Sequence, residues 1–208
     1  MIETIIKGID LHFETKPGVF SPAAIDPGTL AMLSAVEFRP EDKVLDLGCG
    51  YGVVGILAAK LIGPEQVVMT DLADEAVELS RLNAGLNAVG DIRIVQGDGY
   101  ASITDRDFTL ILSNPPYHTD FAVAKGFIEN AFCHLLTGGR LMMVTKRLAW
   151  YRNKIAATFG GVKVMTIDGY YVLAAEKRTD HKPAKVRKPQ RLSKKLERRK
   201  RRNDNENR

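Results

Sequence analysis

The stretch from Val44 to Gly55, VLDLGCGYGVVG, begins as an apolar strand, passes through a run of glycines and opens an amphipathic helix. Glycines between a strand and a helix let the backbone come close to a ligand, and the helix N-terminus favours polar or anionic groups there. A strand, a glycine-rich turn and a helix in this order indicate the ligand-binding unit of an α/β domain.

Apolar strands and amphipathic helices alternate along the rest of the chain in the same way. We expect strands at residues 43–47, 66–70, 92–96, 108–113, 140–145, 162–167 and 170–175, and helices at 52–61, 74–87, 120–136 and 148–159. This alternation predicts an α/β fold around a mostly parallel sheet. The tight link Asp168-Gly169 predicts that the last two strands close the sheet as an antiparallel hairpin.

The first 40 residues lead into this domain. A short hairpin is expected within residues 4–13, turning at 7–10. Asp26 and Pro27 form a typical helix start, with Asp26 as N-cap and proline in the first turn, so a helix is expected to about residue 38.

The net charge of +5 divides the 208 residues into two unlike parts. Residues 1–176 carry 15 Lys+Arg against 21 Asp+Glu, a net of −6, whereas residues 177–208 carry 15 against 4, a net of +11. Apolar residues nearly vanish after residue 176. We therefore expect one domain over 1–176 and a basic, disordered tail over 177–208.

Membrane and metal partners are not expected. No apolar run approaches the roughly 18 residues of a membrane helix, and the N-terminus lacks the pattern of a signal peptide, so a cytoplasmic protein is expected. The two cysteines and four histidines show no metal-ligand spacing.

The glycine loop fits two kinds of ligand. Gly50, Gly52 and Gly55 satisfy G-x-G-x-x-G, and Asp71 follows Gly50 by 21 residues, which is the spacing of a dinucleotide site. Against this, Asp46 stands directly before the loop, where a carboxylate opposes a pyrophosphate but supports a cationic or polar ligand.

The full pattern D-x-G-x-G-x-G, from Asp46 through Gly48, Gly50 and Gly52, resembles the first motif of class I S-adenosylmethionine-dependent methyltransferases. The resemblance implies a Rossmann-like sheet with helices on both faces and S-adenosyl-L-methionine, a phosphate-free sulfonium cation, as cofactor. Two later acidic positions match the same family. The resemblance implies that Asp71, with Leu72, holds the cofactor ribose, and that Asp98, with Gly99, holds the adenine amino group.

The fourth strand ends in Asn114-Pro115-Pro116-Tyr117. Each proline pushes the residue before it to extended geometry, so this segment is stiff. A nucleobase or amide NH2 has a delocalised lone pair and needs hydrogen-bond acceptors rather than a strong base. The side-chain oxygen of Asn114 and the Pro115 carbonyl are candidate acceptors, and Tyr117 is a candidate stacking platform for a planar target. The tetrapeptide resembles the fourth motif of amino-group methyltransferases, which places Asn114 beside the cofactor as well.

Three acceptors share this motif: guanine amines in ribosomal RNA, adenine N6 in nucleic acids, and glutamine N5 in release factors. Residues 11–177 resemble the small methyltransferase domain of the RsmC-type ribosomal RNA guanine-N2 enzymes, through Thr15-Lys-Pro-Gly-Val-Phe-Ser21, Asn114-Pro-Pro-Tyr-His118, Leu136-Thr-Gly-Gly-Arg-Leu141 and Phe159-Gly160. Those enzymes usually carry phenylalanine at the position of Tyr117, whereas adenine and glutamine enzymes commonly carry tyrosine. His118 favours guanine.

Further residues are candidate contacts to the acceptor. By the same resemblance Phe20 flanks the target base or methyl donor, and Pro116 and His118 adjoin it. Lys146 and Arg147 begin a basic and aromatic segment after the fifth strand, which suits phosphates and exposed bases.

The sequence therefore predicts an S-adenosylmethionine-dependent N-methyltransferase acting on an exocyclic amine of RNA. Guanine N2 of ribosomal RNA is the first expectation. Adenine N6, with transfer RNA as one substrate, glutamine N5 and a non-catalytic RNA-binding module are the alternatives. The basic tail favours RNA over a protein acceptor and does not separate guanine from adenine.

Overall fold

The computed structural model describes residues 1–115 and 121–180. The described elements, in chain order, are β1 (Ile2–Ile6), β2 (Ile9–Phe13), α1 (Pro27–Ala35), β3 (Val44–Leu47), α2 (Val53–Ile62), a 3-10 turn η1 (Pro64–Gln66), β4 (Val67–Asp71), α3 (Asp74–Leu86), β5 (Arg93–Gln96), β6 (Phe108–Ser113), α4 (Phe121–His134), β7 (Leu135–Thr145), α5 (Leu148–Phe159), β8 (Lys163–Ile167) and β9 (Tyr170–Glu176).

The described part holds a central seven-stranded sheet in the order β5-β4-β3-β6-β7-β9-β8. The neighbours from β5 to β7 are parallel, and β9 pairs antiparallel with both β7 and β8. The chain moves outward from β3 in one direction and returns to β6 on its other side. Ligands of open α/β sheets bind outside the carboxyl ends of the strands at such a switch point.

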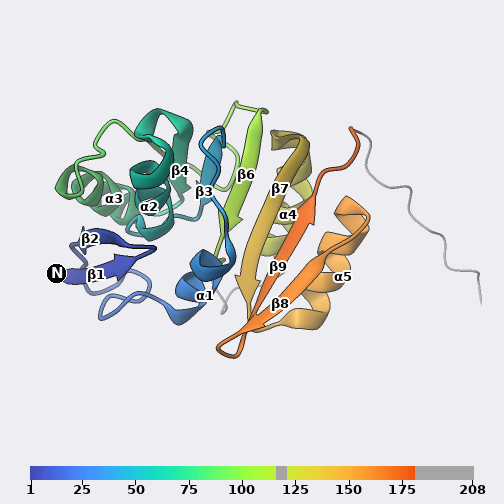
Figure 1. Ribbon diagram of the computed structural model, residues 1–208, viewed down its shortest axis with the longest axis horizontal. Coiled ribbons are helices and arrows are strands. Elements are labelled where there is room, and N and C mark those ends of the chain that lie inside the picture. The colour runs from blue at the N-terminus through green and yellow to red at the C-terminus, as the bar shows by residue number, and fades with distance from the viewer. Residues whose placement is uncertain (116–120, 181–208) are drawn as a thin grey trace, which may run out of the picture.

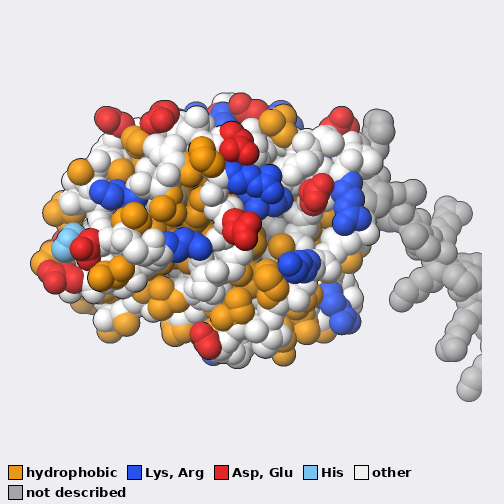
Figure 2. All heavy atoms as spheres, viewed as in Figure 1, with side chains coloured by type: hydrophobic (Ala, Val, Ile, Leu, Met, Phe, Trp, Pro, Cys, Tyr) orange, Lys and Arg blue, Asp and Glu red, His pale blue; other side chains and the backbone are white. Residues whose placement is uncertain are grey.

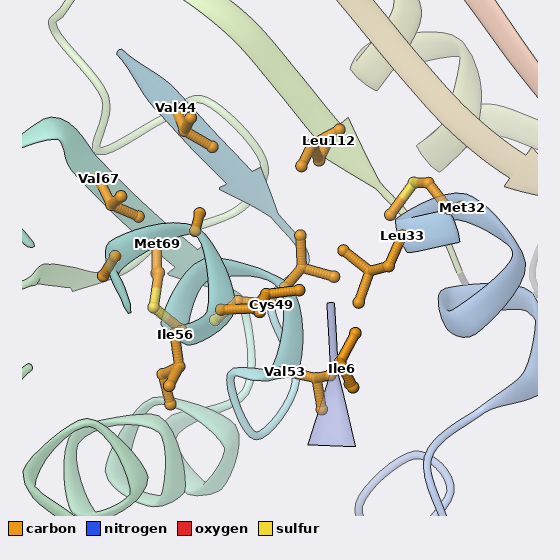
Figure 3. Packing of buried hydrophobic residues seen from close by; sticks show 14 of the residues in the cluster. Ile6, Met32, Leu33, Val44, Cys49, Val53, Ile56, Val67, Met69 and Leu112 are labelled. Carbon is orange, nitrogen blue, oxygen red and sulfur yellow. The ribbon is translucent and has the colours of Figure 1, made fainter. Parts of the chain in front are cut away.

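Two hydrophobic cores lie on opposite faces of the sheet because side chains alternate along each strand. Residues of α1, α2 and α3 share one buried cluster, and residues of α4 and α5 share the other. Figure 1 shows α1 in front of the sheet and α4 behind it. Val44 and Leu112 of neighbouring strands point into the first cluster, which also holds Met32, Ile56 and Met69 (Figure 3). Each such side chain contributes roughly 1.5–3 kcal/mol on burial.

The fold confirms the predicted class: a mostly parallel sheet, a C-terminal antiparallel hairpin and helices on both faces. The closing turn, Asp168-Gly169, has positive φ at both residues (48° and 77°), as a two-residue hairpin with the right-handed twist requires.

The N-terminal hairpin is longer and tighter than predicted. β1 begins at Ile2, and a two-residue turn, Lys7-Gly8, replaces the expected four-residue turn. Both turn residues have positive φ (52° and 78°). The side-chain amides of Asn83 on α3 and of Asn87 at its C-cap bond the backbone of β2 and the residue after it, so the hairpin is docked against α3.

Two predicted boundaries differ from the structure by more than two residues. α1 ends at Ala35 rather than near residue 38, because Val36 turns extended (φ −80°, ψ 138°) and is fully buried. β7 begins at Leu135 rather than at residue 140, since Leu135 pairs with Phe108 across an irregularity in the register. The prediction failed there because Gly138 and Gly139 interrupt the strand pattern.

Lys177, assigned to the tail by composition, packs on β7. Its Nζ donates to the Leu135 carbonyl at 2.8 Å and lies 5.2 Å from the centre of the Phe132 ring, and its backbone bonds Gly138 and Gly139. Its ammonium thus satisfies a backbone acceptor at the start of β7. Almost all of the predicted tail, from residue 181 onward, lies outside the described residues.

Candidate active site

A cavity of about 310 Å³ opens at the carboxyl ends of β3, β4 and β6, at the switch point of the sheet. It is large enough for a small cofactor. The predicted residues that line it are Phe20, Asp46, Gly48, Gly50, Asp71, Leu72, Asp98, Gly99 and Asn114. The structure thus brings together residues from five separate segments of the sequence.

The glycine loop between β3 and α2 curls over the end of β4. The backbone N–H groups of Gly48 and Cys49 both donate to the Thr70 carbonyl, at 2.9 and 3.0 Å. Gly52, predicted to bind cofactor, does not line the cavity. It is the N-cap of α2 in the left-handed region (φ 102°), and a Cβ there would lie 2.8 Å from Ile56 Cδ1. Glycine is therefore required at this position for packing and backbone conformation.

Asp46 lies at the end of β3 and is almost completely buried. Its Oδ2 accepts the backbone N–H of Gly55, inside the first turns of α2, at 2.8 Å. Burial raises the pKa of this carboxyl to about 7, the Gly55 hydrogen bond works in the opposite direction, and the negative charge of Asp71 adds to the rise. A cation bound in the cavity would favour the ionised form of Asp46.

Asp71, at the end of β4, joins two loops. Its Oδ2 accepts from the Gly50 backbone at 2.9 Å and its Oδ1 from the Ala73 backbone at 3.0 Å. Each oxygen keeps further acceptor capacity. Leu72 beside it is 66% exposed and presents apolar surface to the cavity.

Asp98 and Gly99 form the far wall of the cavity with Phe127 of α4. Gly99 has a φ of +58°, and a Cβ there would lie 3.2 Å from the Phe127 ring. The same ring lies beneath Gly48, where a Cβ would approach it to 3.6 Å. Sequence analysis missed Phe127, because nothing in an amphipathic helix marks one apolar residue as the support of two distant glycines.

Asn114 follows β6, whose end is tied to β3 by a 2.7 Å hydrogen bond from the Ser113 hydroxyl to the Leu47 carbonyl. The Asn114 amide nitrogen donates to Asp26 Oδ2 at 2.8 Å and to Thr29 Oγ1 at 2.9 Å. Both partners line the cavity, and neither was predicted as a site residue. The N-cap motif identified Asp26 only as a helix start. Pro115 is buried.

Three predicted site residues, Pro116, Tyr117 and His118, lie outside the described residues. Lys146 and Arg147 follow β7 and do not line the cavity. Both are exposed, and each charge lies over a ring: Lys146 Nζ is 4.6 Å from the centre of Tyr170, and Arg147 Cζ is 5.1 Å from that of Phe121. Phe121 stacks on Trp150, with ring centres 4.4 Å apart.

The cavity is acidic. Five carboxylates line it, and the described lining residues include no lysine or arginine: Asp26, Asp46, Asp71, Glu75 and Asp98. A pyrophosphate would meet no positive side chain among the described lining residues and several negative ones, whereas a cationic ligand without phosphates meets complementary charge. The negative charge of the lining therefore fits a sulfonium nucleoside and does not fit the pyrophosphate of a dinucleotide.

Two other kinds of feature are missing from the part of the chain that the structure describes. No group of three or more His, Cys, Asp and Glu side chains there is placed to hold a metal ion. None of the described helices has the length and apolarity needed to cross a membrane.

Comparison with known proteins places these features in a family. The family model "Methyltransferase small domain" matches residues 10–174. The chain belongs to this methyltransferase small domain family. The match spans the sheet and the cavity, and it confirms the resemblance stated from the Asp46 and Asn114 motifs.

Relatives within the family include ribosomal RNA small subunit methyltransferases C. That of Serratia proteamaculans is 35% identical over 166 residues, covering 78% of this chain and 47% of the relative. One from Haemophilus influenzae is 36% identical over 170 residues, covering 78% and 50%. The chain thus spans about half the length of the curated relatives it matches.

Solved structures show the same likeness. The T. thermophilus 16S rRNA N2 methyltransferase RsmC, in complex with AdoMet and guanosine, has a TM-score of 0.77 at 28% identity, covering 85% of this chain and 50% of that one. TrmN from Thermus thermophilus has a TM-score of 0.62 at 26% identity, covering 72% and 48%. A methyltransferase from Pyrococcus furiosus, at 21% identity and a TM-score of 0.67, shares the fold and covers 80% of this chain and 89% of that one.

Proposed function

We propose that the chain transfers a methyl group from S-adenosyl-L-methionine to an exocyclic amine of RNA, with guanine N2 of ribosomal RNA as the acceptor. The observation that carries this proposal is the placement of the Asn114 amide at the rim of an acidic cavity, beside the carboxyl end of β3. The cavity suits the methyl donor, and Asn114 suits an amine.

The residues that would hold the cofactor lie at or directly after the carboxyl ends of β3, β4 and β5. Asp71 has acceptor capacity for ribose hydroxyls, and Asp98 for the adenine amino group, while Asp46 and the glycine loop lie beneath. When bound, S-adenosylmethionine supplies a methyl group on a sulfonium sulfur, which becomes a neutral thioether as the amine nitrogen takes the methyl and loses one proton.

Asn114 and Pro115 orient the amine. Because both hydrogens of the Asn114 amide are directed to Asp26 and Thr29, the amide oxygen lies on the opposite side of the group. This oxygen and the Pro115 carbonyl would accept the two amine hydrogens and turn the nitrogen lone pair toward the methyl group. Such hydrogen bonds contribute only about 0.5–1.5 kcal/mol each. Positioning, for which effective molarities supply roughly 7–11 kcal/mol, is therefore the larger effect.

RNA as the acceptor is supported by the relatives and by charge. The two curated relatives described above are named as ribosomal RNA methyltransferases, and the T. thermophilus RsmC structure holds guanosine. On the face shown in Figure 2, basic and acidic side chains lie next to one another rather than in one basic field. The basic excess of the chain lies after residue 176, where 15 Lys+Arg stand against 4 Asp+Glu, so we assign phosphate binding mainly to that segment.

Adenine N6 is the second candidate acceptor. It is favoured by Tyr117, which stands where RsmC-type enzymes usually carry phenylalanine. An adenine and a guanine present different edges, but their amines would need the same two acceptors.

Incubation with isotope-labelled S-adenosylmethionine and RNA lacking the modification, followed by nucleoside mass spectrometry, tests the proposal. Labelled N2-methylguanosine is expected; labelled N6-methyladenosine would select the second candidate, and no labelled nucleoside would reject both. Asn114→Ala should lower turnover by about 100-fold or more while cofactor binding by calorimetry is kept. Asn130→Ala, at an exposed position on α4 outside the cavity, is the matched control and should leave turnover unchanged.

A further inference from the structure

We infer that Asp26 and Thr29, at the start of α1, are positioning residues that fix which way the Asn114 amide faces. The inference rests on the proposed function, because it explains how Asn114 presents an oxygen rather than an NH2 to the target amine. It assigns to the N-terminal segment a part in the reaction that its place outside the central sheet does not suggest.

The contact joins distant parts of the sequence in a partly buried position at the wall of the cavity. Asp26 and Asn114 are 88 residues apart, and Thr29 and Asn114 are 85 apart. Asp26 is 8% exposed and Thr29 7%. Water is thus largely excluded from the two acceptors, so the hydrogen bonds of the Asn114 amide nitrogen are not easily replaced by solvent.

The chemistry of the partners permits one orientation of the amide. A carboxylate accepts hydrogen bonds and does not donate them, so Asp26 Oδ2 must face the NH2 of Asn114. A flipped amide would bring its oxygen against the carboxylate. That arrangement loses the hydrogen bond to Asp26 and places like partial charges together, whereas the Thr29 hydroxyl can pair with either end of the amide. The amide oxygen is therefore held on the side away from Asp26, where an acceptor for the target amine is needed.

One oxygen atom of Asp26 has two tasks. Oδ2 also accepts the backbone N–H of Thr29 at 2.9 Å, which is the N-cap bond of α1. The two tasks have different requirements. Serine caps a helix about as well as aspartate, but its side chain is one bond shorter and cannot extend to Asn114. Asparagine keeps an oxygen at the same reach and can serve both.

This difference separates positioning from folding. Asp26→Ser retains the cap, and we expect it to lower kcat by 10- to 100-fold, with the melting temperature and the KM for RNA little changed. Its Kd for S-adenosylmethionine should equal that of Asp26→Asn, because both variants remove the same negative charge from the cavity. Asp26→Asn should restore kcat to within about threefold of the wild type. Thr29→Val should lower kcat and Thr29→Ser should keep it, because only serine retains the hydroxyl acceptor.

Two results would overturn the inference. The first is an Asp26→Ser variant with wild-type kcat. The second is a loss of kcat that follows the melting temperature or the cofactor Kd, since this would make Asp26 a purely structural residue or a cofactor ligand.

A measurement without substrate keeps the inference separate from the proposed function. The side-chain NH2 signal of Asn114, assigned by its loss in Asn114→Ala, should show slow hydrogen exchange in the full chain and fast exchange in Asp26→Ser. Equally fast exchange in both proteins overturns the inference, whatever the activity. Slow exchange in a wild type that methylates no RNA supports the orientation of Asn114 and rejects the proposed function instead.

Discussion

The buried carboxylate of Asp46 accepts the backbone N–H of Gly55 at 2.8 Å, and this contact joins the end of β3 to the first turns of α2 across the glycine loop. One hydrogen bond from a neutral donor does not compensate for the loss of water around a carboxylate. The pKa of Asp46 therefore rises from 3.8 to about 7 in the folded protein.

This shift predicts a pH-dependent stability. Between pH 4 and pH 7 the folded state holds a proton on Asp46 that the unfolded state has lost, so the free energy of unfolding should fall as pH rises through this window. The free energy of unfolding should fall by at most about 4 kcal/mol across this window, since the pKa of Asp46 differs by about 3 between the two states. Denaturant unfolding at pH 4.5, 6 and 8 measures it. Asp46→Asn, which keeps the acceptor for Gly55, should remove this fall, and parallel pH profiles for the two proteins would contradict it.

A second prediction concerns the wall formed by Gly99 and Phe127. Gly99→Ala would combine a positive φ with a Cβ 3.2 Å from the Phe127 ring, so it should destabilise the protein and weaken S-adenosylmethionine binding. Gly138→Ala is the matched control, because Gly138 also has positive φ (87°) and no atom within 4 Å of its added Cβ. The control should lose roughly 1–2 kcal/mol of stability from backbone strain alone. Equal cofactor affinities of the two variants by calorimetry would show that the contact between Gly99 and Phe127 does not support cofactor binding.

The sequence predicted most elements because each carries a local signal. The apolar runs of β3, β4 and β6 and the helical periodicity of α5 placed these elements within a residue or two of their observed bounds. The positions of Asp46, Asp71 and Asn114 at one edge followed, since carboxyl ends of parallel strands share an edge.

The contacts missed by sequence analysis are long-range and chemically ordinary. Asp26 has a complete local explanation as an N-cap, so nothing in the sequence shows that it also bonds an amide 88 residues away. Lys177 has the composition of the tail, yet its ammonium satisfies the Leu135 carbonyl. Tertiary partners decided both cases, and local patterns do not encode them.

The third prediction separates two asparagines at the end of α3, Asn83 within the helix and Asn87 at its C-cap. Asn83 bonds the backbone of Glu14 in both directions and also donates to the Tyr51 carbonyl in the glycine loop, at 2.8 Å. Asn87 bonds the backbone of His12 in the same two-way manner but does not reach the loop. Each substitution by alanine leaves partly buried backbone groups unpaired and should cost about 1–3 kcal/mol.

Only Asn83→Ala should also weaken cofactor binding, because only Asn83 holds the loop that lines the cavity. Thermal unfolding and calorimetry on both variants provide the comparison. Equal cofactor affinities at equal stability would show that the loop keeps its shape without this bond.

The last prediction concerns RNA affinity. Residues 181–208 carry 13 Lys+Arg against 3 Asp+Glu. If this segment neutralises about six phosphates of single-stranded RNA, the logarithm of affinity should fall with the logarithm of salt concentration at a slope of about −4 in excess of the remaining chain. Deletion should begin at residue 181 and not at 177, because Lys177 and Asp180 are bonded to β7 through Leu135 and Thr137.

The comparison needs a control for chain length, so the deleted segment is replaced in a second variant by a Gly/Ser sequence of equal length. Both variants should bind RNA more weakly at low salt than the full chain. Both should show the same flatter dependence of affinity on salt, because each lacks the positive charge of residues 181–208, whatever its length. Their cofactor affinities should equal that of the full chain, since the described residues that line the cavity all precede residue 128. A slope unchanged by deletion would place the phosphate contacts on the folded domain, with exposed Lys146 and Arg147 as the first side chains to substitute.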